Sequence, residues 1–250
     1  MTADRTLPPV VVLCGGHGTR AWPLTRTVPK PLLPLAGVPA LRHLLEIFAR
    51  QDVRDVVLAA GHLVEDVEAF AADLPPEWRV RVVDTGTDTG TGERLRRVAP
   101  MLGGRFLATY GDGLGNVDLR ALLVRHRLAG GSATVTAVPL RSQYGCLQLD
   151  EHDRVVGFRE KPVVENLWIN AGFLVVEQRV FDDWPGPDLE RDVLPELARR
   201  GELHVHRHRG FWASMDTAKD VARLDALAAA DRPPWLAAPA GFDLDERRLA

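Results

Sequence analysis

The chain has 250 residues, of which 46% are hydrophobic and 26% charged, and its formal net charge is -3. These values suit one large globular domain, and the dispersed basic residues argue against a nucleic-acid partner or an anionic membrane. The start of the chain has no signal-peptide pattern and no segment is long and apolar enough to cross a bilayer, so we expect a cytoplasmic protein.

The first half of the chain alternates short apolar runs with helical patterns. Runs typical of buried strands lie at residues 8–14, 53–60 and 105–113. Segments whose apolar residues recur about every 3.6 positions lie at residues 38–51, 63–74 and 117–130. This βαβ series predicts an α/β fold with a Rossmann-like, mixed but mainly parallel sheet flanked by helices.

The second half is richer in strand-like runs. Such runs lie at residues 132–140, 144–150, 154–162, 167–177 and 202–216. Helical patterns lie at residues 188–201 and 217–231. We therefore expect mixed strands beside the parallel sheet, within a single domain over residues 8–230. Residues 231–250 are rich in Pro, Gly and charge, which predicts a C-terminal tail outside the packed core.

A glycine-rich turn follows the first predicted strand, in "VVVLCGGHGTR" at residues 10–20. Gly15, Gly16 and Gly18 allow the backbone to pass close to an anion, and Arg20 adds a forked positive charge. The spacing fits neither the dinucleotide-binding fingerprint nor the P-loop. A tight turn with glycines for geometry alone is the alternative, and a bound polyphosphate is the functional interpretation.

A proline-rich loop follows, with Pro at positions 23, 29, 31 and 34, and these prolines prevent an α-helix from starting there. Lys30 lies between two of them in a stiff segment that can return over the glycine-rich turn. A solvated loop is the alternative for Lys30 alone. Together with the turn, the loop predicts that Arg20 and Lys30 flank one polyphosphate.

The cysteines and histidines do not predict a zinc site. Cys14 and Cys146 lie in different segments and are expected to be two reduced core thiols. His204, His206 and His208 would share one face of a strand, but no cysteine or carboxylate stands at a matching spacing. We expect that strand to be exposed.

Six motifs occur in order: "GGHGTR", "VPKPLLPLAGVP", "GDG", "REKP", "NAGF" and "MD". In this order they resemble the sugar-phosphate nucleotidyltransferases, which join a nucleoside triphosphate to a sugar 1-phosphate, and the segment "VVDTGTDTGTGERLRRV" is most similar to the glucose-1-phosphate cytidylyltransferase branch. The resemblance implies a nucleotide-diphospho-sugar transferase fold. It also implies a nucleotide-binding part at about residues 8–131 and a sugar-phosphate-binding part at about 132–230.

The resemblance assigns roles to residues by motif. Arg20, Lys30 and Lys161 would be catalytic, and Asp112 and Asp216 would share one Mg²⁺; capping a turn or a helix is the alternative for each aspartate alone. The implied nucleotide-binding residues are Leu13, Gly15, Gly16, Gly18, Thr19, Arg20, Thr91, Gly92, Arg94 and Asp112. The implied sugar-phosphate residues are Tyr144, Gly145, Glu160, Lys161, Asn170, Ala171, Gly172 and Glu190.

The implied substrates are CTP and a sugar 1-phosphate. Glucose 1-phosphate is the first candidate, but the sequence around Glu190 differs from that of the resembled cytidylyltransferases, so related hexose or cyclitol phosphates stay open. Uridylyl-, thymidylyl- or guanylyltransferase activity and a regulatory nucleotide-binding subunit are the alternatives. A homo-oligomer is compatible with the sequence.

Overall fold

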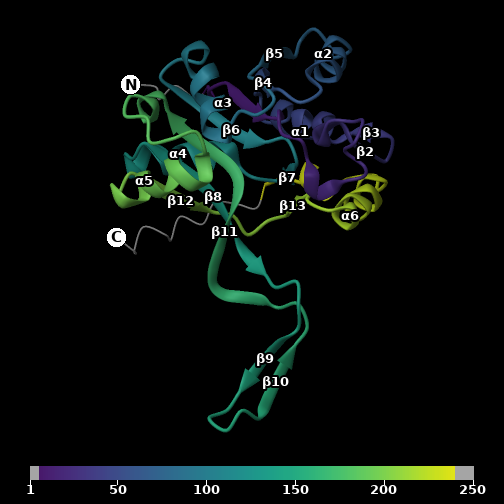
Figure 1. Ribbon diagram of the computed structural model, residues 1–250, viewed down its shortest axis with the longest axis vertical. Coiled ribbons are helices and arrows are strands. Elements are labelled where there is room, and N and C mark those ends of the chain that lie inside the picture. The colour runs from purple at the N-terminus through teal and green to yellow at the C-terminus, as the bar shows by residue number, and fades with distance from the viewer. Residues whose placement is uncertain (1–5, 240–250) are drawn as a thin grey trace.

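The structure, a computed structural model, describes residues 6–239 and is built on a seven-stranded sheet (Figure 1). The strand order is β12-β8-β11-β6-β1-β4-β5. The strands are β1 (Val10–Leu13), β4 (Asp55–Ala60), β5 (Arg79–Asp84), β6 (Arg105–Tyr110), β8 (Ala133–Arg141), β11 (Val163–Glu177) and β12 (Leu203–Arg207). Only β11 runs antiparallel to its neighbours, β6 and β8. The predicted mixed, mainly parallel sheet is confirmed.

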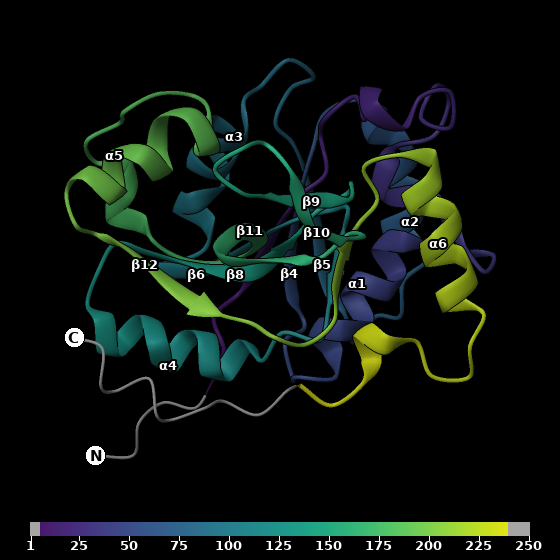
Figure 2. The same ribbon diagram turned by 90° about the horizontal axis from the view of Figure 1, so that it is seen from below.

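Helices cover both faces of this sheet (Figure 2). The α-helices are α1 (Ala40–Ala49), α2 (Val64–Ala72), α3 (Thr91–Val98), α4 (Leu119–Ala129), α5 (Leu194–Arg199) and α6 (Ala218–Ala228). Short 3₁₀ segments are η1 (Thr19–Ala21), η2 (Lys30–Leu32), η3 (Ala99–Met101), η4 (Gln178–Phe181) and η6 (Pro234–Leu236), and a π-helical turn, η5 (Leu189–Val193), precedes α5. The proline-rich loop thus forms 3₁₀ turns and no α-helix, as the prolines predict.

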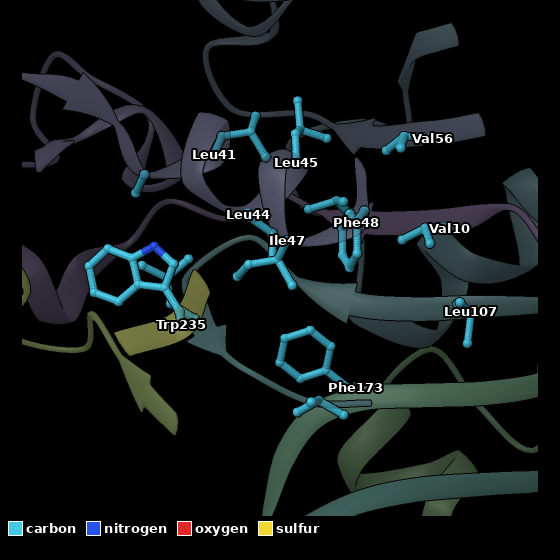
Figure 3. Packing of buried hydrophobic residues seen from close by; sticks show 14 of the residues in the cluster. Val10, Leu41, Leu44, Leu45, Ile47, Phe48, Val56, Leu107, Phe173 and Trp235 are labelled. Carbon is cyan, nitrogen blue, oxygen red and sulfur yellow. The ribbon is translucent and has the colours of Figure 1, made fainter. Parts of the chain in front are cut away.

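The alternation of side chains along β1 divides the core into two halves. Val10 and Val12 face the larger half, which α1, α4 and α6 cover, and Val11 and Leu13 face the half covered by α3 and α5. In the larger half Phe48 and Phe173 meet edge to face, with ring centroids 6.5 Å apart (Figure 3). The parallel strands are therefore buried on both sides, as their continuous apolar runs require.

The core extends beyond the predicted end of the domain at residue 230. Trp235 in η6 is 1% exposed and packs in the larger half of the core, where its ring contacts His43 and Phe211. The expected tail is therefore wrong for its first residues, because one large aromatic side chain is enough to anchor a Pro-rich segment. The part of the tail at residues 240–250 lies outside the described residues.

Two expectations about histidine and cysteine are also wrong. His206 and His208 are 6% and 4% exposed, so this strand does not present them to solvent. Burial lowers the pKa of both imidazoles, that of His206 to about 4. Cys14 is buried, but Cys146 is only partly buried and lies far from the core.

Cys146 belongs to a projection, here called the arm, formed by residues 142–162. Its strands β9 (Cys146–Leu149) and β10 (Val155–Arg159) make a separate antiparallel hairpin that extends away from the body (Figure 1). Two further two-stranded sheets are β2 (Pro34–Leu35) with β3 (Val38–Pro39), and β7 (Gly113–Gly115) with β13 (Trp212–Ser214). Across residues 6–239, no helix has the length and apolar character needed to span a membrane.

Candidate active site

The glycine-rich turn after β1 encloses the side chain of Lys30. Gly18 has a left-handed φ of 63°, and a Cβ at this position would lie 3.0 Å from Lys30 Cβ and from Thr25 Cγ2. The Thr25 hydroxyl donates to the Gly18 carbonyl at 2.9 Å. Glycine at this position thus meets two needs, the left-handed backbone and the close approach of Lys30.

Four charged side chains that the sequence assigns to phosphate and metal binding meet in one cluster. Lys30 Nζ donates to Asp112 Oδ2 at 2.5 Å and to Asp216 Oδ1 at 3.2 Å. A terminal nitrogen of Arg20 lies 2.9 Å from Asp216 Oδ1. Lys30 is 8% exposed, whereas the Arg20 side chain is 74% exposed, so the cluster has one fixed cation and one facing solvent.

Asp216 is held in its ionised form within this cluster. Burial opposes the charge, but the Ser214 hydroxyl, which donates at 2.8 Å, and the nearby cations lower the pKa of Asp216 below its ordinary value. Asp112 and Asp216 meet because they flank paired strands: Asp112 precedes β7, Asp216 follows β13, and the Met215 amide donates to the Asp112 carbonyl at 2.9 Å. This pairing brings together two distant parts of the chain.

A pocket of about 300 Å³ lies beside the charged cluster. Of the residues expected to bind nucleotide, its lining includes Leu13, Gly15, Gly16, Gly18, Thr19, Arg20, Thr91, Arg94 and Asp112. Gly92 is not in the lining; it packs against the segment before η5, where a Cβ would lie 3.1 Å from the Leu189 amide. The lining also includes Thr89 and Tyr110, which the sequence does not mark as site residues. In the sequence, these two residues could have been identified by their position alone: Tyr110 ends a strand and Thr89 precedes a helix, both at the edge of the sheet where ligands bind.

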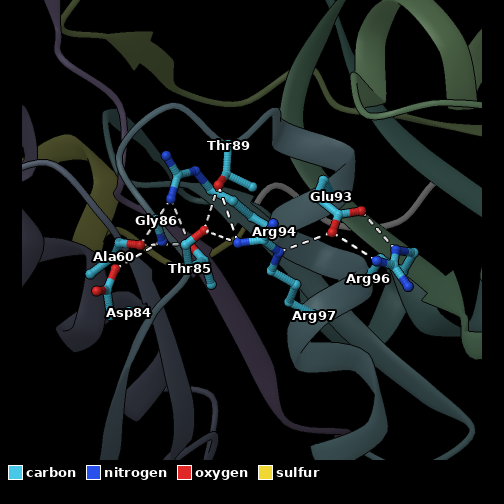
Figure 4. Close-up of polar contacts among 9 residues, drawn as sticks. All are labelled: Ala60, Asp84, Thr85, Gly86, Thr89, Glu93, Arg94, Arg96 and Arg97. Atoms are coloured by element: carbon cyan, nitrogen blue, oxygen red, sulfur yellow. Dashed lines mark hydrogen bonds and ion pairs between the residues drawn. The ribbon is translucent and has the colours of Figure 1, made fainter.

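Arg94 lies beneath this pocket and is 3% exposed (Figure 4). Its terminal nitrogens donate to the carbonyls of Ala60, Gly15 and Thr87 at 2.9, 2.9 and 3.0 Å, and to the Thr85 hydroxyl at 2.5 Å. All four N–H groups of these two nitrogens therefore bind the protein itself. In this structure Arg94 holds three turns together and does not present those groups to a base.

The loop between β5 and α3, residues 85–90, is ordered by further hydrogen bonds (Figure 4). The Thr85 hydroxyl donates to the Ala60 carbonyl and the Thr89 hydroxyl donates to the Thr85 carbonyl, both at 2.5 Å. Arg97 donates to the same Thr85 carbonyl at 2.7 Å. The loop is therefore held by hydrogen bonds of the protein itself, and such preorganisation favours selective recognition.

A second polar group, centred on Tyr110, lies at the edge of the pocket. The Tyr110 hydroxyl donates to the Glu190 carboxylate, which also accepts from the Thr91 hydroxyl at 2.7 Å. Asn170 Nδ2 lies 3.4 Å from the Tyr110 hydroxyl, and a Cβ at Gly172 would collide with the tyrosine ring. Burial and the neighbouring carboxylate raise the pKa of Tyr110, which keeps the hydroxyl protonated as a donor.

The remaining sugar-phosphate residues are not brought to the pocket. Ala171 is 2% exposed, and its carbonyl accepts from the Trp212 indole at 2.7 Å, so it supports the site from below. Tyr144, Gly145, Glu160 and Lys161 all lie on the arm. No arm residue lines the pocket in the part of the chain that the structure describes. The sequence places these residues in one site, and the structure separates them from it.

The donor set of Asp112 and Asp216 fits a magnesium ion. Both are carboxylates that contact the same ammonium, so their oxygens can approach one small cation, and Mg²⁺ is commonly bound by one or two carboxylates together with substrate phosphates. Within residues 6–239 no group of three His, Cys, Asp or Glu side chains could form a complete site. Phosphate oxygens and water would therefore have to complete the coordination.

In open α/β sheets, nucleotides are commonly bound at a glycine-rich turn at the carboxyl ends of parallel strands, the position of this pocket. Residues 9–230 match the nucleotidyl transferase family, and the chain belongs to it. It is 33% identical to a probable glucose-1-phosphate cytidylyltransferase of Bacillus subtilis, over 90% of this chain and 98% of the relative. It is 35% identical to a mannose-1-phosphate guanylyltransferase of Mycobacterium tuberculosis, over 85% of this chain and 62% of the relative.

Solved structures confirm the fold. The crystal structure of HddC from Yersinia pseudotuberculosis complexed with GMP-PN has a TM-score of 0.71 to this chain at 21% identity, covering 88% of this chain and 99% of that one. The predicted nucleotide-diphospho-sugar transferase fold is therefore confirmed, and the chain is a nucleotidyltransferase whose relatives include enzymes named for sugar 1-phosphates.

Proposed function

We propose that the protein transfers a cytidylyl group from CTP to a sugar 1-phosphate, either glucose 1-phosphate or a related hexose or cyclitol phosphate, and releases pyrophosphate. An oxygen of the sugar phosphate bonds to the α-phosphorus of CTP. The bond from that phosphorus to the bridging oxygen breaks, and pyrophosphate leaves with the electron pair. The observation that carries the proposal is the convergence of Arg20, Lys30, Asp112 and Asp216 beside a glycine-lined pocket.

The residues of the cluster supply positioning and charge, which are the main needs of phosphoryl transfer. The glycine-rich turn presents backbone amides to the triphosphate, and Arg20 and Lys30 neutralise the charge that develops as pyrophosphate leaves. Lys30 is fixed for this role by its two carboxylate partners. Magnesium held by Asp112 and Asp216 would neutralise charge on the α-phosphate and the sugar phosphate. The sugar phosphate is largely dianionic at neutral pH, its second pKa being about 6, so no general base is needed.

The preference for cytosine rests on the ordered loop at residues 85–90 and on the names of the relatives. Cytosine offers two acceptors and an amino donor, which backbone N–H and C=O groups of this loop can match. Two relatives at 33% identity, from Bacillus subtilis and Salmonella typhi, are named glucose-1-phosphate cytidylyltransferases. The guanylyltransferase relative makes GTP the strongest competing nucleotide.

The test is pyrophosphate release from CTP, UTP, dTTP, GTP and ATP, each with a panel of sugar 1-phosphates and Mg²⁺. We expect turnover with CTP and at least one hexose or cyclitol phosphate. Comparable kcat/KM with UTP, dTTP or GTP would refute the cytosine preference, and no pyrophosphate from any pair would refute the transferase reaction. Asp112→Asn and Asp216→Asn should abolish turnover, while Asp55→Asn, an exposed aspartate paired with Arg79, should not.

The three lysines of the chain provide a second, matched test. Lys30→Ala should lower kcat with little change in sugar-phosphate affinity, and Lys161→Ala should weaken sugar-phosphate affinity while calorimetry shows unchanged CTP binding. A charge-assisted contact is worth about 1.5–3 kcal/mol, which corresponds to a loss of roughly 10- to 150-fold. Lys219→Ala, on the surface helix α6, is the control. Loss of CTP binding in Lys161→Ala with intact sugar-phosphate affinity would contradict the assignment of Lys161.

A further inference from the structure

The end of strand β12 carries an alternation of histidine and arginine that the proposed reaction does not use. Within residues 206–209 the two histidines are buried, whereas Arg207 and Arg209 are exposed. His208 continues the pairing of the strand, because its amide donates to the Ala137 carbonyl at 2.8 Å. Side chains alternate between the two faces of a strand, so the imidazoles anchor one face and both guanidinium groups lie on the other.

An indole ring lies against both arginines. The guanidinium carbons of Arg207 and Arg209 are 5.2 and 5.3 Å from the ring centroid of Trp168, which is within the range of a cation–π contact. Trp168 is partly buried and pairs with Pro139 on β8, so the sheet fixes the position of the ring. A cation–π contact positions a guanidinium by its charge, and N–H donors at the edge of the group stay available to an acceptor.

The Arg209 side chain has no carboxylate partner in the part of the chain that the structure describes. Within residues 6–239 it makes neither a hydrogen bond nor an ion pair and contacts only the ring of Trp168. Other exposed arginines, such as Arg79 beside Asp55, are paired with carboxylates. The planar fork of a guanidinium matches the oxygens of a phosphate or a carboxylate. Arg209 therefore offers donors to an anionic ligand.

The two arginines lie in line with residues expected to hold the sugar. Strands β12, β8 and β11 are neighbours in the sheet (Figure 1). Ala137 on β8 pairs with Arg207 on one side and Asn170 on the other, so these two residues share a face and lie roughly 10 Å apart, two strand spacings. Asn170 Nδ2 lies 3.4 Å from the hydroxyl of Tyr110, which lines the pocket. The order outward from the pocket is therefore Tyr110, Asn170 and the arginines.

We propose that Arg207 and Arg209, positioned by the indole of Trp168, form a second anion site that binds a phosphate or carboxylate group carried by the sugar at a position remote from its 1-phosphate. The preferred substrate is then a hexose or cyclitol 1-phosphate with a second anionic group. An arginine side chain and a sugar ring with its substituent together span the distance between Asn170 and the arginines. The inference rests on the proposed function for the position of the 1-phosphate.

The test compares sugar phosphates that differ in their second charge. Glucose 1-phosphate, glucuronic acid 1-phosphate and glucose 1,6-bisphosphate are titrated into the protein by calorimetry, with CTP present and Mg²⁺ removed by EDTA so that no turnover occurs. We expect at least one of the two sugars with a second charge to bind about tenfold or more tightly than glucose 1-phosphate, which corresponds to one charge-assisted hydrogen bond. A wild-type protein without such a preference would overturn the site.

Variants assign the preference to the arginines. Arg207→Gln combined with Arg209→Gln should bind the three sugar phosphates with affinities within about twofold of one another. Arg81→Gln is the matched control and should keep the preference, because Arg81 is an exposed arginine on β5, the other edge strand of the same sheet. A preference that survives in the double variant would overturn the assignment.

Trp168 is a positioning residue in this proposal, because it acts through the arginines. Trp168→Leu should lower the ratio between the affinities for the doubly and singly charged sugars, whereas Trp168→Phe, which keeps an aromatic ring, should retain most of it. A purely structural role would lower the free energy of unfolding and leave this ratio as it is in the wild type. That result in Trp168→Leu would contradict the positioning role.

Free anions and the transferase reaction are separated by two further measurements. Inorganic phosphate is titrated into the wild type and the double variant under the same conditions. Phosphate that binds only in the presence of the arginines, with no gain from a second charge on the sugar, would show a site for free anions and overturn the assignment to the sugar.

Pyrophosphate release with Mg²⁺ gives the other measurement. Turnover of glucose 1-phosphate without preference for a second charge would refute the anion site and leave the reaction intact. A charge preference in binding that depends on the arginines, without pyrophosphate release from any pair, would refute the reaction and leave the anion site intact. If none of the three sugar phosphates binds, the anion site is refuted as well.

Discussion

Replacing the buried Arg94 by methionine tests whether one guanidinium organises the nucleotide pocket. The change removes four hydrogen bonds, although the Ala60 carbonyl keeps the Thr85 hydroxyl as a donor and the Gly15 carbonyl keeps the His62 amide. Each buried polar group left unsatisfied costs about 1–3 kcal/mol, but the variant no longer has to bury a charge, so the losses do not add in full. We expect the free energy of unfolding to fall by about 1–3 kcal/mol, the cost of leaving a buried polar group without its partner.

The assay combines urea unfolding with calorimetric titration of CTP. The variant should bind CTP at least about tenfold more weakly, because the turn at Gly15 and the loop at Thr85–Thr87 lose their common anchor. Arg94→Lys, with three donors in a different geometry, should fall between the two proteins. Arg96→Met, which removes a surface pair with Glu93, is the matched control and should cost less than about 1 kcal/mol. Arg94→Met with wild-type unfolding and wild-type CTP affinity would refute this reasoning.

Three further predictions concern glycine, pH and the C-terminal aromatic anchor. Gly15→Ala should destabilise the fold and weaken CTP binding, because the added Cβ would collide with the buried guanidinium of Arg94. Gly16→Ala is the control, since a Cβ there has no atom within 4 Å, and equal losses of stability in both variants would contradict the steric argument. Burial lowers the pKa of His206 from 6.5 to about 4, so at pH values between these two the unfolded chain binds a proton that the folded chain does not, and the free energy of unfolding decreases as the pH is lowered. In urea unfolding the wild type should therefore lose about 2 kcal/mol more than His206→Gln between pH 7 and pH 5, and equal losses in both proteins would contradict this assignment. Trp235→Ala should lower the free energy of unfolding by about 3–5 kcal/mol, whereas Leu128→Ala, at an exposed position, should lower it by less than about 0.5 kcal/mol. A similarly small loss in both variants would mean that η6 does not unfold together with the core.

The sequence predicts the layered fold and the charged cluster because both depend on local patterns. Continuous apolar runs followed by 3.6-residue periods define the parallel strands and their helices. In such a sheet the ligand edge is fixed by topology, so the position of Asp112 after a strand already places it at the site. The glycines at the turn and the prolines around Lys30 restrict the backbone in ways that hold in any tertiary context.

The arm, the buried histidines and the Trp235 anchor could not be predicted in the same way. Alternation at residues 144–162 indicates strands, but it does not say whether a hairpin folds back on its body or extends from it. His206 and Trp235 stand in segments whose average polarity is that of a surface, and their burial depends on which neighbours the tertiary fold supplies. Arg94 does line the pocket, but only its contacts show that the donors of its two terminal nitrogens are already used by the protein.

The pairing of β7 with β13 also sets the order in which the charged cluster is assembled as the chain leaves the ribosome. Asp112 is synthesised in the first half of the chain, together with the glycine-rich turn and Lys30, but its partner Asp216 follows β13, near the end. Strand β11, which lies between β6 and β8, must be inserted before the sheet is complete. The nascent chain therefore carries the glycine-rich turn and Lys30 long before it has both carboxylates, and the charged cluster is one of the last parts of the molecule to be completed.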